Sequence, residues 1–440
     1  MSQEANWDML VVGGTVLTME SDTEPIKNGA VAVADGRIAA VGPAEELLEL
    51  SASGEVLNAG NSIIMPGLVN THSHLAMTLL RGIADDIPLK EWLEQHIWPV
   101  ESKYMDRETV RLGTELATAE QLLAGVTTTA DMYFYGDEVA AVLTEAGMRG
   151  VVAESLIDFS TPRCATPEEM FEKQRELLET YSDHPLITPS VAAHSPYSVG
   201  AANLAKEAEL AEEFEVPMQI HLAETRWEVE QLLSEKDVSP VAYLADLGVL
   251  SERTVAAHCV HVSTEDIELL AEFEVGVSHN PVSNLKLASG VSPVPALIAN
   301  GVKVGLGTDG AASNNTLDLL RDMQLAALLH KGMAGDPTVL PARRMLELAT
   351  TDGARVLGLD NTGVLAEGCE ADLICVAVGG PRTAPMYDPF SHLVFAARSC
   401  DVRHVMIRGQ VVVRNHALQT LDSERIEAQA REFSELVRSS

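Results

Sequence analysis

The chain has 440 residues, 46% of them hydrophobic, and a formal net charge of −35 at pH 7 from 65 acidic and 30 basic residues. This composition is enough for a large buried core, and the length fits either several domains or an α/β barrel with a smaller unit attached. A chain with this negative charge repels nucleic-acid phosphates and anionic lipids. We therefore expect neither nucleic-acid binding nor membrane association.

The sequence also predicts the compartment. No apolar run approaches the ~20 residues that span a bilayer, and the start, MSQEANWD, lacks the basic and apolar regions of a secretory signal. The five cysteines are odd in number, scattered, and form no CxxC pair. This use of cysteine is typical of a reducing environment, so we expect a cytoplasmic protein.

Segments with the pattern of β-strands lie at both ends of the chain. Residues 8–62 hold short apolar runs broken by turns, and two of these runs flank Asp35 and Gly36, a pair typical of a tight hairpin. Residues 363–415 contain similar runs. A long middle segment with a different pattern separates the two β-rich ends.

In the middle segment, short apolar strands alternate with helical stretches. Residues 202–215 place apolar side chains on one face at helical spacing, and Ser263 with Asp266 resembles a capping box at a helix start. The predicted strands are 63–71, 126–132, 150–157, 187–194, 217–222, 254–260, 275–279 and 303–308. Eight strands alternating with helices predict a (β/α)8 barrel, an α/β fold.

Polar residues gather where these predicted strands end. In a (β/α)8 barrel the chemistry lies at the carboxyl ends of the strands, where the βα loops begin. The strand ends read NTHSH (70–74), TTADMY (128–133), VAESLID (152–158), AAHSPYS (192–198), IHLAET (220–225), AAHCVH (256–261), VSHNPVSN (277–284) and GTDGAASNN (307–315). Histidine, aspartate and glutamate therefore recur around one rim, which predicts an active site there.

Two histidines close the first predicted strand. Residues i and i+2 of a strand point the same way, so His72 and His74 can bind one ion together. A bare HxH is more often two unrelated histidines than a site, but His221 and Asp309 close later strands of the same barrel. Three imidazoles and a carboxylate suit Zn²⁺ or Fe²⁺ with a position left for water, and we expect a catalytic metal site.

Two further residues lie beside these ligands. Glu224 follows His221 by three residues and can act as a proton shuttle, because a divalent ion lowers the pKa of its bound water to ~7. His258 closes the next strand and can polarise that water; the alternative is a hydrogen-bonded core histidine. Asp309 can serve both as ligand and as acceptor of the second proton of the water.

Five motifs, in this order and spacing, resemble the amidohydrolase superfamily: PGLVNTHSHLAMTLLRG, HLAET, AAHCVH, SHNPVSNLKL and GTDGAASNN. Within it they are most similar to the 5'-methylthioadenosine/S-adenosylhomocysteine deaminases, almost end to end. The resemblance implies a barrel at 63–355 and a small β-sandwich built from 1–62 and 356–440, the last part including a C-terminal helix. It also implies one divalent metal ion per subunit, with Zn²⁺ favoured over Fe²⁺, and a homo-oligomer, either a dimer or a tetramer.

The resemblance also implies a role for individual residues. His72, His74, His221 and Asp309 would hold the metal. Glu224 would shuttle protons and contact the purine, and His258 would polarise the water. His194 would reach the nucleoside, and Glu101 would bind the ribose hydroxyls, although by position alone Glu101 is only a glutamate at a helix end. Trp92 and Trp98 could form walls of the pocket.

One position departs from the family pattern. Some members carry an arginine near the end of the third strand that holds the substrate tail, and here Glu154 stands there. Arg149 and Arg163 are the nearest basic residues. The amino-acid tail of S-adenosylhomocysteine then lacks an evident carboxylate partner, which favours methylthioadenosine or adenosine as substrate.

We therefore expect a metal-dependent aminohydrolase that converts adenine nucleosides to the inosine-type product and ammonia. Water activated by the ion would attack C6 while Glu224 protonates N1. Two alternatives remain open. One is hydrolysis of another ring, such as guanine, 8-oxoguanine, a pterin or an s-triazine. The other is a non-catalytic scaffold that retains the barrel, although such relatives usually lose ligands.

Overall fold

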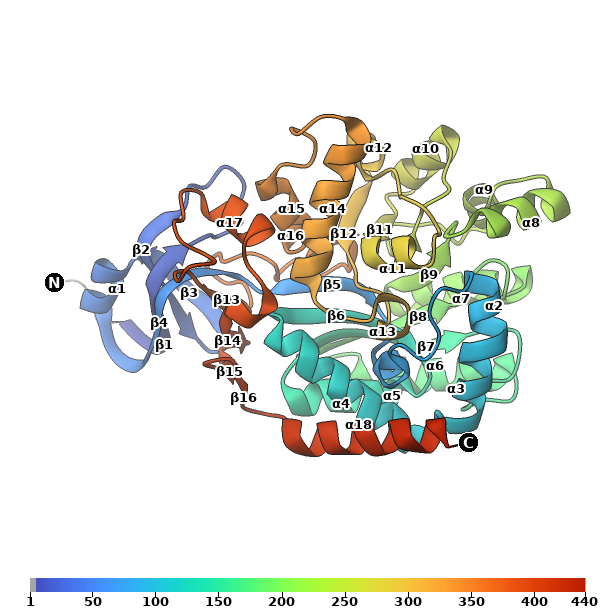
Figure 1. The fold of residues 1–440 in the computed structure, drawn as a ribbon, viewed down its shortest axis with the longest axis horizontal. Coiled ribbons are helices and arrows are strands. Elements are labelled where there is room, and N and C mark those ends of the chain that lie inside the picture. Colours follow the sequence, from blue (N-terminus) through green and yellow to red (C-terminus); the bar gives the residue numbers. More distant parts are fainter. Residues whose placement is uncertain (1–4, 440) are drawn as a thin grey trace.

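Two eight-stranded sheets form the framework of the protein, a computed structural model of which describes residues 5–439 (Figure 1). The first sheet combines strands from both ends of the chain, in the order β16-β15-β14-β13-β4-β1-β2-β3. Its strands are β1 Ala5–Val16, β2 Ile26–Ala34, β3 Arg37–Pro43, β4 Ser51–Pro66, β13 Leu373–Ala377, β14 Val402–Ile407, β15 Gln410–Arg414 and β16 Ala417–Leu418.

The first sheet folds back on itself. Val31 and Val33 from β2 share one buried cluster with Leu373 of β13 and Met406 of β14, although these strands lie far apart in the strand order. The predicted turn between β2 and β3 is confirmed: Asp35 and Gly36 have φ of 51° and 75°, the left-handed conformation that a tight hairpin requires. The expected small β-sandwich from both chain ends is thus present.

The second sheet is the predicted barrel. Its eight strands run parallel in chain order from β5 to β12. They are β5 Leu68–Ser73, β6 Val126–Tyr133, β7 Arg149–Leu156, β8 Ile187–Ala193, β9 Met218–Leu222, β10 Thr254–His258, β11 Gly276–His279 and β12 Lys303–Leu306. The last strand returns to the first, because Asp309 N donates to His72 O at 3.0 Å and Thr308 N donates to Asn70 Oδ1 at 3.0 Å. The (β/α)8 fold class is therefore confirmed.

The first predicted strand was placed too early. Residues 63–66 belong to β4 of the first sheet, where Met65 lies opposite Ile374, and the barrel begins at Leu68. Gly67 lies at the change between sheets, and a Cβ there would come within 2.0 Å of the Thr127 hydroxyl oxygen, so only glycine fits without displacing that side chain. Apolar content alone could not separate two consecutive buried strands. The division of the chain at residues 62 and 355 stays a prediction.

Most of the helices cover the outside of the barrel, whereas the first one packs against the first sheet (Figure 1). They are α1 Ala44–Leu50, η1 Leu75–Leu80, α2 Leu89–Glu91, η2 Trp92–Ile97, α3 Trp98–Tyr104, α4 Arg107–Leu123, α5 Gly136–Ala146, α6 Pro167–Tyr181, α7 Ala201–Phe214, α8 Arg226–Lys236, α9 Pro240–Asp246, α10 Thr264–Glu272, α11 Pro281–Lys286, α12 Val294–Ala299, α13 Ala311–Asn314, α14 Leu319–Ala334, α15 Ala342–Leu348, α16 Thr351–Val356, α17 Pro389–Phe395, η3 Ser399–Asp401 and α18 Ser423–Arg438. Across residues 5–439, none of the helices could cross a membrane, since none is long and apolar enough.

Two local predictions about helices are confirmed. The helix expected at 202–215 is α7, and the capping box at the start of α10 forms between Ser263 and Asp266. The C-terminal helix α18 runs along α4 (Figure 1), and Arg425 of α18 donates to Glu115 of α4 at 2.8 Å. The end of the chain is thereby fixed to the barrel.

A buried ion-pair group joins the two sheets. Arg149, at the start of β7, donates from Nε to Asp372 at 2.8 Å and from a terminal nitrogen to Glu370 at 3.0 Å. Its side chain is 9% exposed and that of Asp372 only 1%. A pair buried this deeply destabilises the fold when one partner is removed, because the other charge is left without compensation.

Replacing Arg149→Met should therefore lower the free energy of unfolding by about 3–5 kcal/mol. Urea denaturation followed by circular dichroism measures this loss. The matched control is Arg431→Met, which removes an exposed i,i+4 pair with Glu427 and should leave the midpoint nearly unchanged. Equal midpoints for the two variants would contradict a structural role of the buried pair.

Candidate active site

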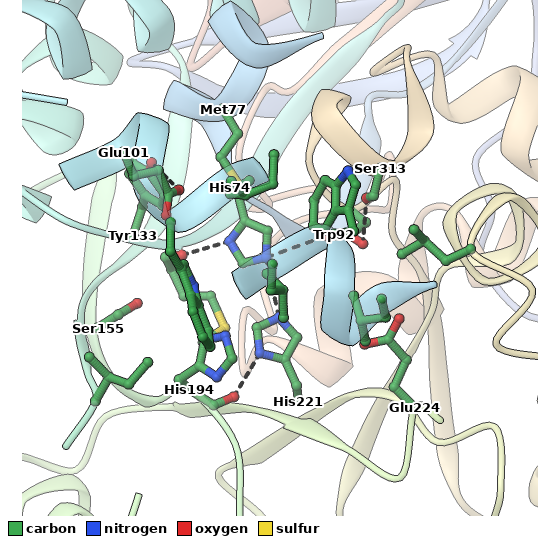
Figure 2. Close-up of a pocket in the computed structure, with 18 of the residues that line it drawn as sticks. His74, Met77, Trp92, Glu101, Tyr133, Ser155, His194, His221, Glu224 and Ser313 are labelled. Atoms are coloured by element: carbon green, nitrogen blue, oxygen red, sulfur yellow. Dashed lines mark hydrogen bonds and ion pairs between the residues drawn. The ribbon is translucent and has the colours of Figure 1, made fainter. Parts of the chain in front are cut away.

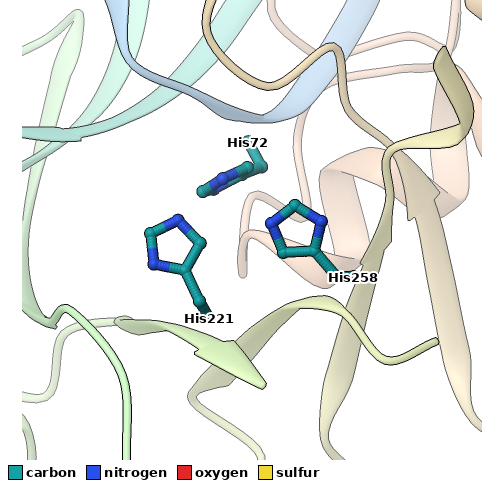
Figure 3. Close-up of side chains that lie close together, drawn as sticks. All are labelled: His72, His221 and His258. Carbon is teal, nitrogen blue, oxygen red and sulfur yellow. The ribbon is translucent and has the colours of Figure 1, made fainter. Parts of the chain in front are cut away.

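The carboxyl ends of the barrel strands bring the predicted polar residues together at one rim. His72 lies on β5 and His74 directly follows it, His221 lies on β9, His258 ends β10, and Asp309 follows β12. The ring centre of His72 lies 4.8 Å from that of His74 and 4.9 Å from that of His221. Figure 3 shows the rings of His72, His221 and His258 converging from three different strands.

In His74 and His221, a hydrogen bond to a main-chain carbonyl determines which ring nitrogen faces the centre of the site. The Nδ1 of His74 donates to Met132 O at 2.7 Å, and the Nδ1 of His221 donates to His194 O at 2.6 Å. A carbonyl oxygen can only accept, so the proton of each neutral ring lies on Nδ1 and its Nε2 carries a lone pair. Burial lowers the pKa of both rings and keeps them neutral.

These two lone pairs face each other, with the Nε2 atoms of His74 and His221 3.2 Å apart. Nitrogen atoms with lone pairs repel each other at this distance unless a cation lies between or beside them. The Nε2 of His72 is also buried and has no hydrogen-bond partner. Two inward lone pairs beside a third imidazole nitrogen without a partner are the arrangement that a bound divalent ion satisfies.

A carboxylate completes this donor set. Asp309 Oδ1 lies 3.3 Å from Nε2 of His74 and 3.5 Å from Nε2 of His72. The other oxygen, Oδ2, accepts from the hydroxyls of Ser283 and Ser313 at 2.6 and 2.8 Å. These bonds orient the carboxylate and leave Oδ1 directed toward the imidazoles. Histidine nitrogens with one carboxylate oxygen suit Zn²⁺ or Fe²⁺, so the residues present fit the expected divalent ion.

The backbone bends sharply where two of these residues leave their strands. His258 has φ of 75° and Asp309 has φ of 62°, left-handed values that non-glycine residues rarely adopt. Such a conformation costs about 1–3 kcal/mol. These bends end β10 and β12 at the rim of the barrel. The side chains of His258 and Asp309 are buried there, beside the other histidines.

Glu224 and His258 form a second pair at the site. A carboxylate oxygen of Glu224 lies 3.7 Å from Nε2 of His258. The Nδ1 of His258 is 2.8 Å from the amide oxygen of Asn284, which accepts its proton and so turns Nε2 toward Glu224. Ser289 donates to Glu224 at 3.2 Å. This set of contacts fixes both side chains in orientations that suit proton transfer.

Burial governs the acidity of this pair. It raises the pKa of Glu224 to about 7, where the carboxyl group can both accept and donate a proton near neutral pH. Burial by itself would lower the pKa of His258, but the negative charges of Glu224 and Asp309 outweigh it and raise that pKa. The pair therefore combines an acid–base carboxyl with an imidazole that tends to be cationic.

A cavity opens beside the histidines, a concave site of the kind that binds small organic ligands. Its walls are mostly apolar and include Trp92 and Trp98, as the sequence suggested. Figure 2 shows Glu101 and Tyr133 on one side of His74 and Glu224 on the other. A ligand bound next to the histidines can therefore contact Glu101 at one end and Glu224 at the other.

Glu101 and His194 both line this cavity. Tyr133 donates its hydroxyl to Glu101 Oε1, and burial raises the pKa of Glu101 to about 7. His194 is held through Nδ1 by Ser198 Oγ at 2.8 Å, and burial lowers its pKa to about 3, which keeps the ring neutral. Both residues present polar groups in an otherwise apolar wall.

Strand β7 carries Glu154, the residue that stands where some family members have an arginine, and this side chain does not face the site. Glu154 does not line the cavity; it accepts from Gly136 N at 2.8 Å and from Arg163 at 2.6 Å, while the neighbouring Ser155 lines the cavity. Successive residues of a strand point to opposite faces, which explains the exchange. Arg163 also binds Asp137, and Arg149 is committed to the ion pair between the sheets.

The sequence reasoning missed two residues that contact the site. Tyr133 is the last residue of the strand end TTADMY, which lies on the predicted rim, but the sequence analysis gave it no role. Ser289 gave no signal, because it lies in a loop 65 residues from Glu224, the residue it contacts.

Comparison with known proteins agrees with this geometry. Residues 63–412 match the amidohydrolase family, and residues 29–50 match an imidazolonepropionase-like composite domain of bacteria. The chain is 45% identical to the 5-methylthioadenosine/S-adenosylhomocysteine deaminase of Syntrophobacter fumaroxidans over 98% of both chains. It is 44% identical to that of Moorella thermoacetica, over 94% of this chain and 98% of the relative.

Solved structures show the same arrangement. An adenosine deaminase from Xanthomonas campestris with bound zinc superposes with a TM-score of 0.97 at 38% identity, covering 99% of both chains. The zinc complex of the atrazine chlorohydrolase TrzN from Arthrobacter aurescens gives a TM-score of 0.90 at 26% identity, over 97% of this chain and 99% of that chain. With this fold, this site and a family match over most of its length, the chain belongs to the amidohydrolase family.

Proposed function

We propose that this protein is a metal-dependent hydrolytic deaminase of adenine nucleosides that yields the inosine-type product and ammonia. The candidate substrates are 5'-methylthioadenosine, S-adenosylhomocysteine and adenosine. The observation that carries the proposal is the placement of Glu224 and Glu101 on opposite sides of the histidine cluster in one apolar cavity. Relatives with 39–45% identity that carry deaminase names support it.

We assign His72, His74, His221 and Asp309 as ligands of one divalent ion, with zinc favoured over iron. The inward-facing lone pairs of His74 and His221 support this assignment, as does the zinc in the adenosine deaminase from Xanthomonas campestris. When bound, the ion would lower the pKa of a water molecule to about 7 and so supply a nucleophile at neutral pH.

Protons move through the side chains around this water. Glu224 accepts one proton from the attacking water and delivers it to N1 of the purine, so that C6 becomes tetrahedral as the C6–O bond forms. His258 donates toward the attacking oxygen and stabilises its developing negative charge. Asp309 would take the second proton and return it to the amino group, either directly or by way of Glu224. The C6–N bond then breaks and ammonia leaves, with a carbonyl at C6.

Two residues would hold the sugar and the base edge. Glu101 would accept hydrogen bonds from the ribose hydroxyls, and these are strongest when the carboxylate is ionised. The neutral His194 would contact the nucleoside through the ring nitrogen that Ser198 does not hold. A substrate without ribose would lose the contacts to Glu101, and this favours nucleosides over free bases.

Two alternative functions follow from the same site. The same cluster could hydrolyse another ring, and the likeness to TrzN favours an s-triazine among these alternatives. A non-catalytic scaffold would have no need of lone pairs held face to face, so the cluster argues against it. Assembly as a homodimer or tetramer and a cytoplasmic location stay predictions.

Replacing Glu224→Gln should lower kcat for methylthioadenosine about 10²–10⁴-fold, because the amide can neither accept nor return a proton. Loss of the adenine absorbance follows the reaction. Metal content should stay unchanged, since Glu224 is not among the proposed ligands. Glu235→Gln, an exposed change on α8, is the control. Near-full activity of Glu224→Gln would contradict the mechanism.

Removing the metal with a chelator should abolish deamination, and one equivalent of Zn²⁺ per chain should restore it. Because the ion binds only the folded chain, it should also raise Tm, and His221→Ala should show no such rise. Metal analysis and differential scanning calorimetry measure the two effects. A stoichiometry near two, or a Tm that zinc leaves unchanged, would argue against the proposed site.

The pKa of about 7 for Glu101 predicts how substrate binding depends on pH. As pH falls through 7, the carboxylate gains a proton, loses acceptor strength toward ribose, and KM for the nucleoside rises. In Glu101→Gln, KM should be high at every pH and should lose this dependence. Steady-state kinetics between pH 6 and 8, roughly one unit on each side of that pKa, test this. An identical pH profile of KM in both proteins would exclude Glu101 as the titrating group.

A further inference from the structure

The cavity gives the charged end of S-adenosylhomocysteine no basic partner. Among residues 5–439, those that line it include no lysine or arginine. The nearby cations are engaged elsewhere: Arg163 binds Glu154 and Asp137, and Lys286 binds Asp85. A substrate whose 5' group ends in an amino acid would carry a carboxylate and an ammonium that must be received outside this cavity.

A second groove continues from the cavity. The two share five wall residues, namely Leu89, Leu93, Trp98, Phe159 and Tyr197. The groove adds Lys90, Glu94, Ser198, Trp227 and Gln231. It therefore starts as an apolar and aromatic passage and ends among polar groups, between the α2–η2 segment on one side and the start of α8 on the other.

Lys90 and Glu94 lie at this polar end as one pair of opposite charges. The Nζ of Lys90 is 3.9 Å from the carboxylate of Glu94, and the two side chains are 51% and 49% exposed. The same Nζ lies 4.7 Å from the ring centre of Trp227 on α8, so it extends toward the opposite wall of the groove. An exposed pair at this distance is weak and can exchange its partners for those of a ligand.

We propose that this groove is the subsite for the amino-acid end of a 5'-thioether nucleoside, with Lys90 binding the α-carboxylate and Glu94 the α-ammonium. The proposal rests on the proposed function. An α-amino acid carries one positive and one negative group a short distance apart, and the Lys90–Glu94 pair presents the complementary charges. The shared aromatic walls would contact the thioether chain between the two sites.

The assignment replaces the expectation that S-adenosylhomocysteine is disfavoured because an arginine is lacking. In this chain the third strand presents Ser155 to the cavity, and the compensating charge comes from α2, a segment that follows the first barrel strand. Methylthioadenosine, which ends in a methyl group, would occupy only the cavity and would be indifferent to Lys90.

Kinetics of Lys90→Gln with three nucleosides test the proposal. The substrates are S-adenosylhomocysteine, methylthioadenosine and the decarboxylated analogue 5'-deoxy-5'-(3-aminopropylthio)adenosine. We expect kcat/KM to fall about fivefold to tenfold for S-adenosylhomocysteine, the loss of one charge-assisted contact at a partly exposed site. For the other two substrates it should stay within about twofold, because neither has a carboxylate.

Salt gives an independent readout. Raising NaCl from about 0.05 to about 0.5 M should raise KM for S-adenosylhomocysteine in the wild-type enzyme, because exposed charges are screened, and much less in Lys90→Gln. The matched control is Lys173→Gln, a partly exposed lysine on α6 that also pairs with a glutamate, Glu176, and does not line either cavity.

Other kinetic results would contradict the proposed subsite. Equal losses for all three nucleosides would show a structural effect of Lys90, and unchanged kinetics for S-adenosylhomocysteine would show that the carboxylate binds elsewhere. Wild-type turnover of methylthioadenosine without turnover of S-adenosylhomocysteine would overturn the subsite and leave the proposed function standing. Turnover of no adenine nucleoside would overturn both.

Discussion

Closure of the barrel is the constraint on which the rest of this protein depends. The main-chain hydrogen bond from Asp309 N to His72 O, at 3.0 Å, joins the last strand to the first and brings together residues 237 positions apart by the numbering. The carboxylate of Asp309 reaches His72 and His74 only because of this bond. Without closure, the pair His72 and His74 would lie far from Asp309, at the opposite edge of an open sheet.

The electrostatics of the site follow from burial combined with directed hydrogen bonds. Burial keeps the imidazoles of His74 and His221 neutral, and the carbonyls of Met132 and His194 hold their protons on the outer nitrogen. Both inner nitrogens are therefore ready to bind a cation without first losing a proton. The same burial raises the pKa of Glu224 into the neutral range. One physical effect thus prepares the ligands and the acid–base group together.

Substrate selection depends on segments outside the strands. The α2–η2–α3 segment after β5 supplies Trp92, Trp98 and Glu101 to the cavity and Lys90 to the adjoining groove. Helix α8 supplies Trp227 to the same groove from the far side of the barrel mouth. A rigid rim therefore carries the reacting groups, while helices between strands set which part of a nucleoside can be held. This division matches the way (β/α)8 enzymes vary their substrates through loops.

Much of this could be predicted from the sequence. The period of apolar strands and helices determined the barrel, the HxH spacing with His221, Glu224, His258 and Asp309 at later strand ends determined the candidate site, and Asp35-Gly36 determined a hairpin. Each of these signals is local, because side-chain direction alternates along a strand and left-handed turns need particular residues.

Only the tertiary structure decided the features that depend on which face a side chain occupies or which distant segment it meets. It divided the apolar run 63–71 between two sheets at Gly67, turned Glu154 outward and Ser155 inward, and brought Ser289 to Glu224 and Lys90 beside Trp227. Contacts between residues far apart in the chain arise from packing and barrel closure. No local pattern records them, since the same short sequence can lie on either face of a strand or beside any neighbour.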